Sequence, residues 1–185
     1  MTNEVEKYYE TSDLCLKISR NNHRKVAIEI LEEKIRNAKN HWEIVAIKEH
    51  LATEYVLDHR IVDGRRMREE LIVLNANSEM SLSGLASHYF YVEENAMKAL
   101  DILDSAETES FKTGNFRRHI QAQKARIALA ISDYSLLSEA LEKIVSIFVA
   151  SGQRDVRKER DFFDPADKAK LDPSLVEKFE RYLIE

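Results

Sequence analysis

The sequence has few of the residues that interrupt helices. Its 185 residues include four glycines and two prolines, whereas average usage of roughly 7% and 5% would give about 13 and about 9. Glycine-rich phosphate loops and β-hairpin sandwiches depend on these residues for their tight turns. Their scarcity excludes both classes and favours an all-helical protein.

Cysteine and long apolar stretches are also scarce. The single cysteine, Cys15, excludes an internal disulfide and a cysteine-based zinc cluster. The N-terminal residues are acidic and polar, unlike a secretory signal, and the longest uncharged stretch, residues 80–92, is too short and too polar to cross a bilayer. We therefore expect a cytoplasmic protein without a membrane helix.

An excess of positive charge is absent as well. The formal net charge is −5, which argues against a general nucleic-acid binder. Locally, residues 93–109 carry a net charge of −5 and residues 112–126 a net charge of +5. Two interpretations are open: the neighbouring helices attract each other through surface ion pairs, which we favour, or they present a bipolar surface to a partner of opposite pattern.

A second group of basic residues surrounds one predicted turn. It consists of Arg60, Arg65, Arg66 and Arg68. Acidic residues are interspersed among these arginines, so a solvated turn of mixed charge is favoured over a contact with phosphate or RNA.

Apolar residues recur at helical spacing almost throughout the chain. The positions of polar and small residues between the apolar stretches predict about eight helices before residue 150, arranged in pairs, with one of the loops at Asp63–Gly64. These helices define a predicted helical-repeat domain over residues 1–150.

The pattern changes after Gly152. Residues 154–161 alternate in charge and read as a linker. The steps Asp164-Pro165 and Asp172-Pro173 each place a capping side chain before a proline, which predicts the start of a short helix. Residues 151–185 are therefore predicted to hold a charged linker and short C-terminal helices, packed on the same domain. The last helix either caps the helical array or occupies its binding groove.

One short pattern recurs at a fixed distance. Leu51-Ala52-x-x-Tyr55 is repeated 34 residues later as Leu85-Ala86-x-x-Tyr89, and a looser version stands upstream as Leu14-Cys15-x-x-Ile18. The middle residue is small each time, which suits a close crossing of two helices, while the large residues fill the core between them.

This pattern resembles the tetratricopeptide repeat, a unit of two helices and 34 residues that stacks into a solenoid with a concave groove. The first and third units match best. In the second unit Gly64 or Met67 stands where the family has an alanine, and the family's initial Trp and closing Pro are missing throughout. The resemblance implies an all-α fold in which antiparallel helix pairs stack as a tetratricopeptide-like α-solenoid with a C-terminal capping helix.

Catalytic and metal-binding patterns do not stand out. His41, His50 and His59 are nine residues apart, so they lie on alternating faces of a helix and cannot share one ion. We expect each of the six histidines at a surface or on a helix flank. Adjacent glutamates such as Glu69-Glu70 diverge by about 100° and cannot flank one bond. We predict no catalytic residue, no metal ion and no cofactor.

The resemblance to tetratricopeptide repeats implies that the first helix of each pair lines the groove. The corresponding inward positions are the predicted partner-binding residues: Glu49, Thr53, Val56, Ser83, Ser87, Phe90, Tyr91 and Arg126. Phe90 and Tyr91 are the strongest candidates, because aromatic residues are enriched at binding hot spots. The alternative for Phe90 is packing against the next helix.

These observations predict noncovalent recognition of a protein or peptide. Two alternatives stay open. One is a neutralising protein of the immunity or antitoxin kind, which a pronounced charge match with a toxin would indicate. The other, less favoured, is a helical-bundle enzyme whose site is assembled from scattered residues.

Overall fold

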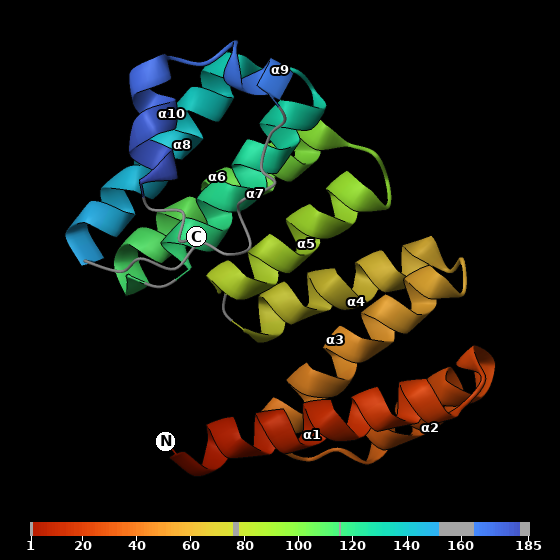
Figure 1. Cartoon of the computed structure of the whole chain (residues 1–185). Helices are drawn as coiled ribbons and strands as arrows, with labels where there is room; N and C mark the ends of the chain where they lie inside the picture. Colours follow the sequence, from red (N-terminus) through yellow and green to blue (C-terminus); the bar gives the residue numbers. More distant parts are fainter. Residues whose placement is uncertain (1, 76–77, 115, 152–164, 182–185) are drawn as a thin grey trace. The chain divides into compact units, whose positions relative to one another are not determined.

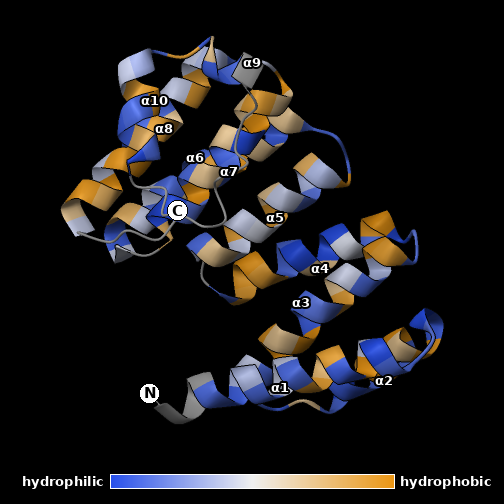
Figure 2. Cartoon of the chain, in the orientation of Figure 1, coloured by the Kyte–Doolittle hydropathy of each residue, from blue (hydrophilic) through white to orange (hydrophobic). Residues whose placement is uncertain are grey.

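The computed structural model describes residues 2–75, 78–114, 116–151 and 165–181, and within these residues every regular element is a helix. Along the chain they are α1 (Thr2–Asn21), α2 (Arg24–Asn37), α3 (His41–Leu57), α4 (Ile61–Leu74), α5 (Glu79–Tyr91), α6 (Ala96–Thr113), α7 (Arg117–Ala130), α8 (Tyr134–Ser151), α9 (Pro165–Lys168) and α10 (Pro173–Glu180) (Figure 1). The all-α prediction is confirmed. Most helices carry both polar and apolar residues along their length (Figure 2), so each buries only part of its surface.

The chain forms two compact units, residues 1–88 (unit 1) and residues 89–185 (unit 2). In unit 1, α3 packs against α1, α2 and α4. In unit 2, α7 packs against α6 and α8, and α10 packs against α8. The predicted division at residue 150 stays a prediction.

The core of unit 1 is built on the recurring pattern. Leu51, Ala52 and Tyr55 of α3 are buried, and Leu51 and Tyr55 pack in one cluster with Leu31 of α2 and Cys15 of α1. Cys15 is fully buried, and this burial raises the pKa of its thiol to about 11. Leu85 and Ala86 of α5 are buried as well, so the pattern marks core positions in these two copies. In the upstream copy, 43% of Leu14 is exposed, so the prediction that this residue fills the core is wrong.

Gly64 lies inside α4, so the predicted loop at Asp63–Gly64 is wrong. The turn comes earlier, at residues 58–60, where His59 has a φ of 62°. A Cβ atom at Gly64 would lie 2.7 Å from Cγ2 of Val56 and 2.9 Å from the carbonyl oxygen of Ala52. Glycine is present here because α3 and α4 cross too closely for a side chain.

Gly64→Ala is expected to lower the free energy of unfolding. Overpacking costs about 1–3 kcal/mol, and the better helix propensity of alanine offsets at most about 1 kcal/mol of this. The matched control is Gly84→Ala in α5, where the new Cβ would approach only the Arg68 guanidinium, at 3.3 Å. Circular dichroism melting would measure both. A Gly64→Ala protein whose melting temperature equals or exceeds that of the Gly84→Ala protein would contradict the close crossing of α3 and α4.

The core of unit 2 is closed by the C-terminal helix. Ala125 of α7, Leu141 and Phe148 of α8, and Leu175 and Phe179 of α10 belong to one buried cluster. The small alanines of α7 allow α8 to approach closely. α10 thus covers the last helix pair, which confirms the predicted capping helix.

The helix starts follow the predicted capping chemistry. Asp172 accepts hydrogen bonds from the backbone N–H groups of Ser174 (2.7 Å) and Leu175 (3.3 Å) at the start of α10. α9 begins at Pro165, as predicted. The capping side chain predicted at Asp164, most of the charged linker and the last residues of the chain lie outside the described residues.

Candidate partner-binding sites

The predicted site residues of α3 differ in accessibility. Glu49 is half-buried and accepts a hydrogen bond from the Tyr8 hydroxyl of α1; burial raises the pKa of Glu49, while Tyr8 and Arg68 oppose the rise. Thr53 is exposed, and its hydroxyl donates to the Glu49 carbonyl oxygen at 3.2 Å. Val56 is half-buried, with its methyl group directed at the α3–α4 crossing. Thr53 is therefore the most open of the three.

On α5, the predicted residues become more exposed toward the C-terminal end of the helix. Ser83 is buried and Ser87 is half-buried. Phe90 is half-buried, whereas 63% of the Tyr91 surface is exposed. The Phe90 and Tyr91 rings meet edge to face with their centroids 4.7 Å apart. They form one aromatic pair at the start of unit 2, which we call the Phe90–Tyr91 pair.

Arg126, the predicted residue of α7, is also exposed in unit 2. The predicted residues therefore divide between the units. Glu49, Thr53, Val56, Ser83 and Ser87 belong to unit 1, and Phe90, Tyr91 and Arg126 belong to unit 2.

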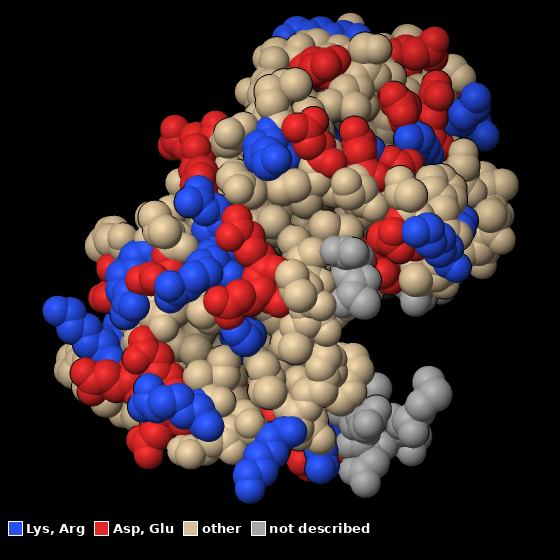
Figure 3. Space-filling view, turned by 180° about the vertical axis from the view of Figure 1, so that it is seen from behind, with Lys and Arg blue, Asp and Glu red and all other residues tan. Residues whose placement is uncertain are grey.

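Three of the four arginines after α3 form ion pairs with their neighbours, whereas Arg68 is half-buried and its Nε has no hydrogen-bond partner among the described residues. Arg60 contacts Asp63 (2.8 Å), and Arg66 contacts Asp63 (3.1 Å) and Glu70 (3.9 Å). Arg65 contacts Glu69 at 3.8 Å. Basic and acidic side chains are interspersed over the face that Figure 3 shows. The charges are mixed, as the sequence predicts, but Arg65, Arg66 and Arg68 lie within α4, so the predicted turn at these residues is wrong.

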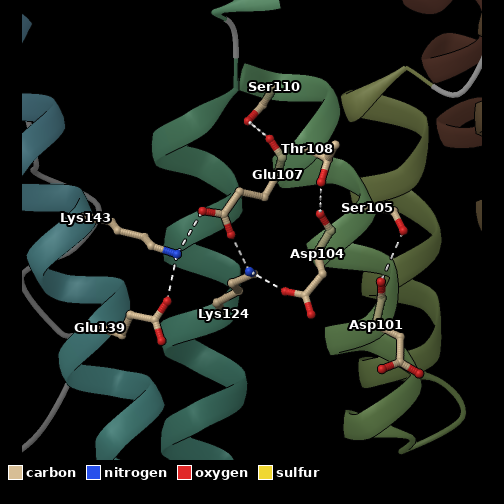
Figure 4. A network of polar contacts seen from close by, with 9 residues as sticks. All are labelled: Asp101, Asp104, Ser105, Glu107, Thr108, Ser110, Lys124, Glu139 and Lys143. Atoms are coloured by element: carbon tan, nitrogen blue, oxygen red, sulfur yellow. Dashed lines mark hydrogen bonds and ion pairs between the residues drawn. The ribbon is translucent and has the colours of Figure 1, made fainter. Parts of the chain in front are cut away.

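A polar network around the buried Lys124 joins three helices of unit 2 (Figure 4). The Lys124 ammonium of α7 contacts Asp104 of α6 at 2.6 Å and also Glu107 of α6. Lys143 of α8 contacts Glu107 at 2.9 Å and Glu139 at 2.8 Å. Lys124 thus links the acidic stretch to the basic stretch, as expected, but it does so as a buried lysine and not through a surface ion pair.

Glu107 stays ionised although it is largely buried. Burial by itself would raise its pKa, but hydrogen bonds from Lys124 and Lys143 outweigh this effect and hold the pKa of Glu107 below its usual value. Gln121 of α7 also donates to Glu107. The network is therefore held by charge-assisted hydrogen bonds.

Sequence reasoning missed a cleft in unit 2. About 780 Å³ in volume, it is bounded by the end of α6, the start of α7 and the end of α8, and we call it the α6–α8 cleft. Phe111, Phe116, Arg117, Arg118 and Gln121 are among its lining residues. None of the predicted partner-binding residues lines it. The net positive charge of residues 112–126 was the one signal of it in the sequence.

One of the six histidines lies in the core and not at the surface. His88 is 2% exposed, so the expectation of six surface or flanking histidines is wrong at this position. Across residues 2–75, 78–114, 116–151 and 165–181, no three His, Cys, Asp or Glu side chains are grouped closely enough to hold a metal ion. Over the same ranges, no helix has the length and apolarity that a membrane span requires.

Comparison with known proteins shows the fold. No protein-family profile matches the chain, and no curated protein matches it in sequence. A crystal structure of nearly identical TPR-like repeats, from a Podosopora anserina protein described as a kinesin light chain, is similar to it at 17% identity, with a TM-score of 0.61. The similarity covers 95% of this chain and 94% of that one. A single-substitution variant of that protein is similar at 18% identity, with the same TM-score, over 95% and 92% of the two chains.

Proposed function

We propose that this chain, a divergent repeat protein of tetratricopeptide-like fold, works by noncovalent recognition of another protein or a peptide. Helical-repeat scaffolds present extended surfaces rather than enclosed reaction sites. The similarity to TPR-like repeats over nearly the whole chain supports this proposal. No cofactor or metal ion enters it.

The observation that carries the proposal is the Phe90–Tyr91 pair. A tyrosine with 63% of its surface exposed, in edge-to-face contact with a second aromatic ring, offers a large apolar area on a rigid side chain with two rotatable bonds. Such residues lose little conformational entropy on binding and are enriched at hot spots. In unit 1, the exposed Thr53 is the predicted position that a partner reaches most easily.

Tyr91→Ala and Phe90→Ala are expected to weaken partner binding by about tenfold or more, because hot-spot truncations cost about 2 kcal/mol or more. The melting temperature should change little for Tyr91→Ala, whose ring is mostly in solvent. Affinity capture from the native lysate, with quantitative mass spectrometry of the retained proteins, compares each variant with the wild-type protein.

The matched control is Met97→Ala on α6, because Met97 is also an exposed apolar residue of unit 2, at 66%. It should retain the same partners as the wild-type protein. If the wild-type protein and the Tyr91→Ala, Phe90→Ala and Met97→Ala variants all captured the same proteins in the same amounts, the Phe90–Tyr91 pair would have no role in binding. A large loss of melting temperature for Tyr91→Ala with unchanged capture would assign the pair to packing.

Catalysis remains the alternative that one contact favours. The Ser12 hydroxyl oxygen of α1 lies 3.0 Å from Nε2 of His50 in α3, a spacing that nucleophile and base share in enzymes. Burial lowers the pKa of His50. Unit 1 has a cleft between α1, α2 and α3, and neither Ser12 nor His50 lines it. We therefore favour binding. If the wild-type protein hydrolysed members of a panel of ester substrates and Ser12→Ala abolished this hydrolysis, catalysis would be favoured instead.

A further inference from the structure

The α6–α8 cleft of unit 2 combines cationic and aromatic side chains. Arg117 and Arg118 line it from the start of α7, and Lys143 lines it from α8 but is already paired with Glu107 and Glu139. Glu107 is the carboxylate on its wall, and two lysines already neutralise it. The lining therefore favours an anionic ligand.

Arg117 is held in place before any ligand arrives. Its guanidinium donates to the carbonyl oxygens of Ser110 (3.3 Å) and Phe111 (3.1 Å) at the end of α6 and lies 4.8 Å from the centre of the Phe111 ring. A guanidinium fixed in this way loses little entropy when it binds a carboxylate. Arg118, the next residue, is exposed.

Two aromatic rings of the cleft are open to solvent. Phe111 is 60% exposed and Phe116 is 44% exposed. Phe116 also has a φ of 57°, a left-handed conformation that is unfavourable for a residue other than glycine. Exposed apolar rings beside cations suit a ligand that has apolar as well as anionic groups.

Gln121 adds a requirement for a hydrogen-bond donor. The residue is 3% exposed and lines the cleft, and its amide N–H donates to Glu107. Its Oε1 is buried and has no hydrogen-bond partner among the described residues. A buried acceptor without a partner is unfavourable, so a ligand N–H group that reaches Oε1 when the Gln121 amide turns toward the cleft would satisfy it.

We propose that the α6–α8 cleft binds an extended acidic segment of a partner protein. Carboxylates of the segment pair with Arg117 and Arg118, an apolar side chain lies against Phe111 and Phe116, and a backbone N–H donates to Oε1 of Gln121. A peptide brings all three groups at once, whereas inorganic phosphate has no apolar group, and the net charge of −5 on the chain argues against a nucleic acid. The proposal rests on the protein-recognition function above, but at a place that none of the eight predicted residues lines.

Peptide binding to the full chain tests the proposal. The probe is a fluorescein-labelled octapeptide of aspartate and glutamate with one central leucine, followed by fluorescence anisotropy at low salt. We expect saturable binding that weakens with added salt. Arg118→Glu should weaken it at least tenfold. Lys98→Glu on α6, an exposed residue of unit 2 away from the cleft, makes the same charge change and should alter Kd by less than about twofold.

Three results would overturn the proposal. One is equal binding of the probe to the wild-type protein and the Arg118→Glu protein. Another is equal or tighter binding of the matched lysine peptide. The third is tighter binding of a single-stranded oligonucleotide that competes with the probe, which would make the cleft a polyanion site. The Arg118 guanidinium lies 5.8 Å from the centre of the buried Phe148 ring, so melting curves of Arg118→Glu and Lys98→Glu are needed to separate lost binding from lost folding.

The probe also separates this inference from the proposed function. Tyr91→Ala should leave probe binding unchanged, since Tyr91 does not line the cleft. If lysate partners depend on Tyr91 and the probe binds independently of Arg118, the cleft assignment fails and the proposed function stands. If the probe depends on Arg118 and no lysate partner depends on the Phe90–Tyr91 pair, the proposed hot spot fails and the cleft stands.

Discussion

Phe179→Ala is expected to lower the free energy of unfolding by about 3–5 kcal/mol, the usual cost of removing a buried phenylalanine side chain. Phe179 is 1% exposed and packs from α10 into the cluster that Leu141 and Phe148 form in α8. At about 2–4 °C per kcal/mol, the melting temperature should fall by about 10 °C. Thermal melting followed by circular dichroism measures the loss.

The control for this variant lies on the same helix. Lys178 is exposed, so Lys178→Ala should change the free energy of unfolding by no more than about 0.5 kcal/mol. If α10 were instead a mimic of the partner resting in a binding groove, Phe179→Ala would raise partner affinity and leave melting unchanged. That result would contradict the capping role.

Glu107→Ala is expected to cost about 3 kcal/mol, because it removes the buried carboxylate that Lys124 and Lys143 share. Lys124 has 6% of its side chain exposed and would keep only the solvent-exposed Asp104 as a partner. Combining Glu107→Met with Lys124→Met should recover most of the loss, since no unpaired buried charge remains. Chemical denaturation of the single and double variants gives these free energies.

Glu109→Ala is the matched control, because Glu109 pairs with Lys112 at the surface of the same helix. Surface pairs contribute about 0–1 kcal/mol. A Glu107→Ala protein as stable as Glu109→Ala would show that the network does not hold α6, α7 and α8 together.

The same network predicts how stability depends on pH. The pKa of Glu107 is lower in the folded chain than its usual value, so its contribution is fully present above the ordinary glutamate range of about 4.3. It is lost as the pH falls through the folded-state pKa. The wild-type protein should therefore lose more stability than Glu107→Gln between neutral pH and acid. Parallel losses would contradict the assignment.

The sequence predicted the helices well because their signals are local. Leu51, Ala52 and Tyr55 occupy the core positions that their spacing indicates, and Asp172 caps α10 as its place before a proline indicates. Gly64 was misassigned for a physical reason. A glycine marks either a turn or a close approach of two backbones, and only the packing of α3 on α4 distinguishes them.

The candidate sites were harder to predict, because they depend on tertiary contacts. Val56 shares a helix with Thr53, yet its methyl group is directed at Gly64 while Thr53 faces solvent. Arg117 and Phe111 lie together at the α6–α8 cleft because α7 folds back on α6. The positive charge of this region can be predicted from a single sequence, but the contact between the Arg117 guanidinium and the Phe111 ring cannot.

Cys15 can report the rate at which the core of unit 1 opens. It is the single thiol, it is fully buried in the core of unit 1, and its raised pKa keeps it protonated at neutral pH. A thiolate-selective reagent therefore reacts with Cys15 only when the core of unit 1 opens and exposes the thiol. The rate of labelling by such a reagent reports the opening of unit 1 in the intact chain, with no engineered probe and no contribution from unit 2.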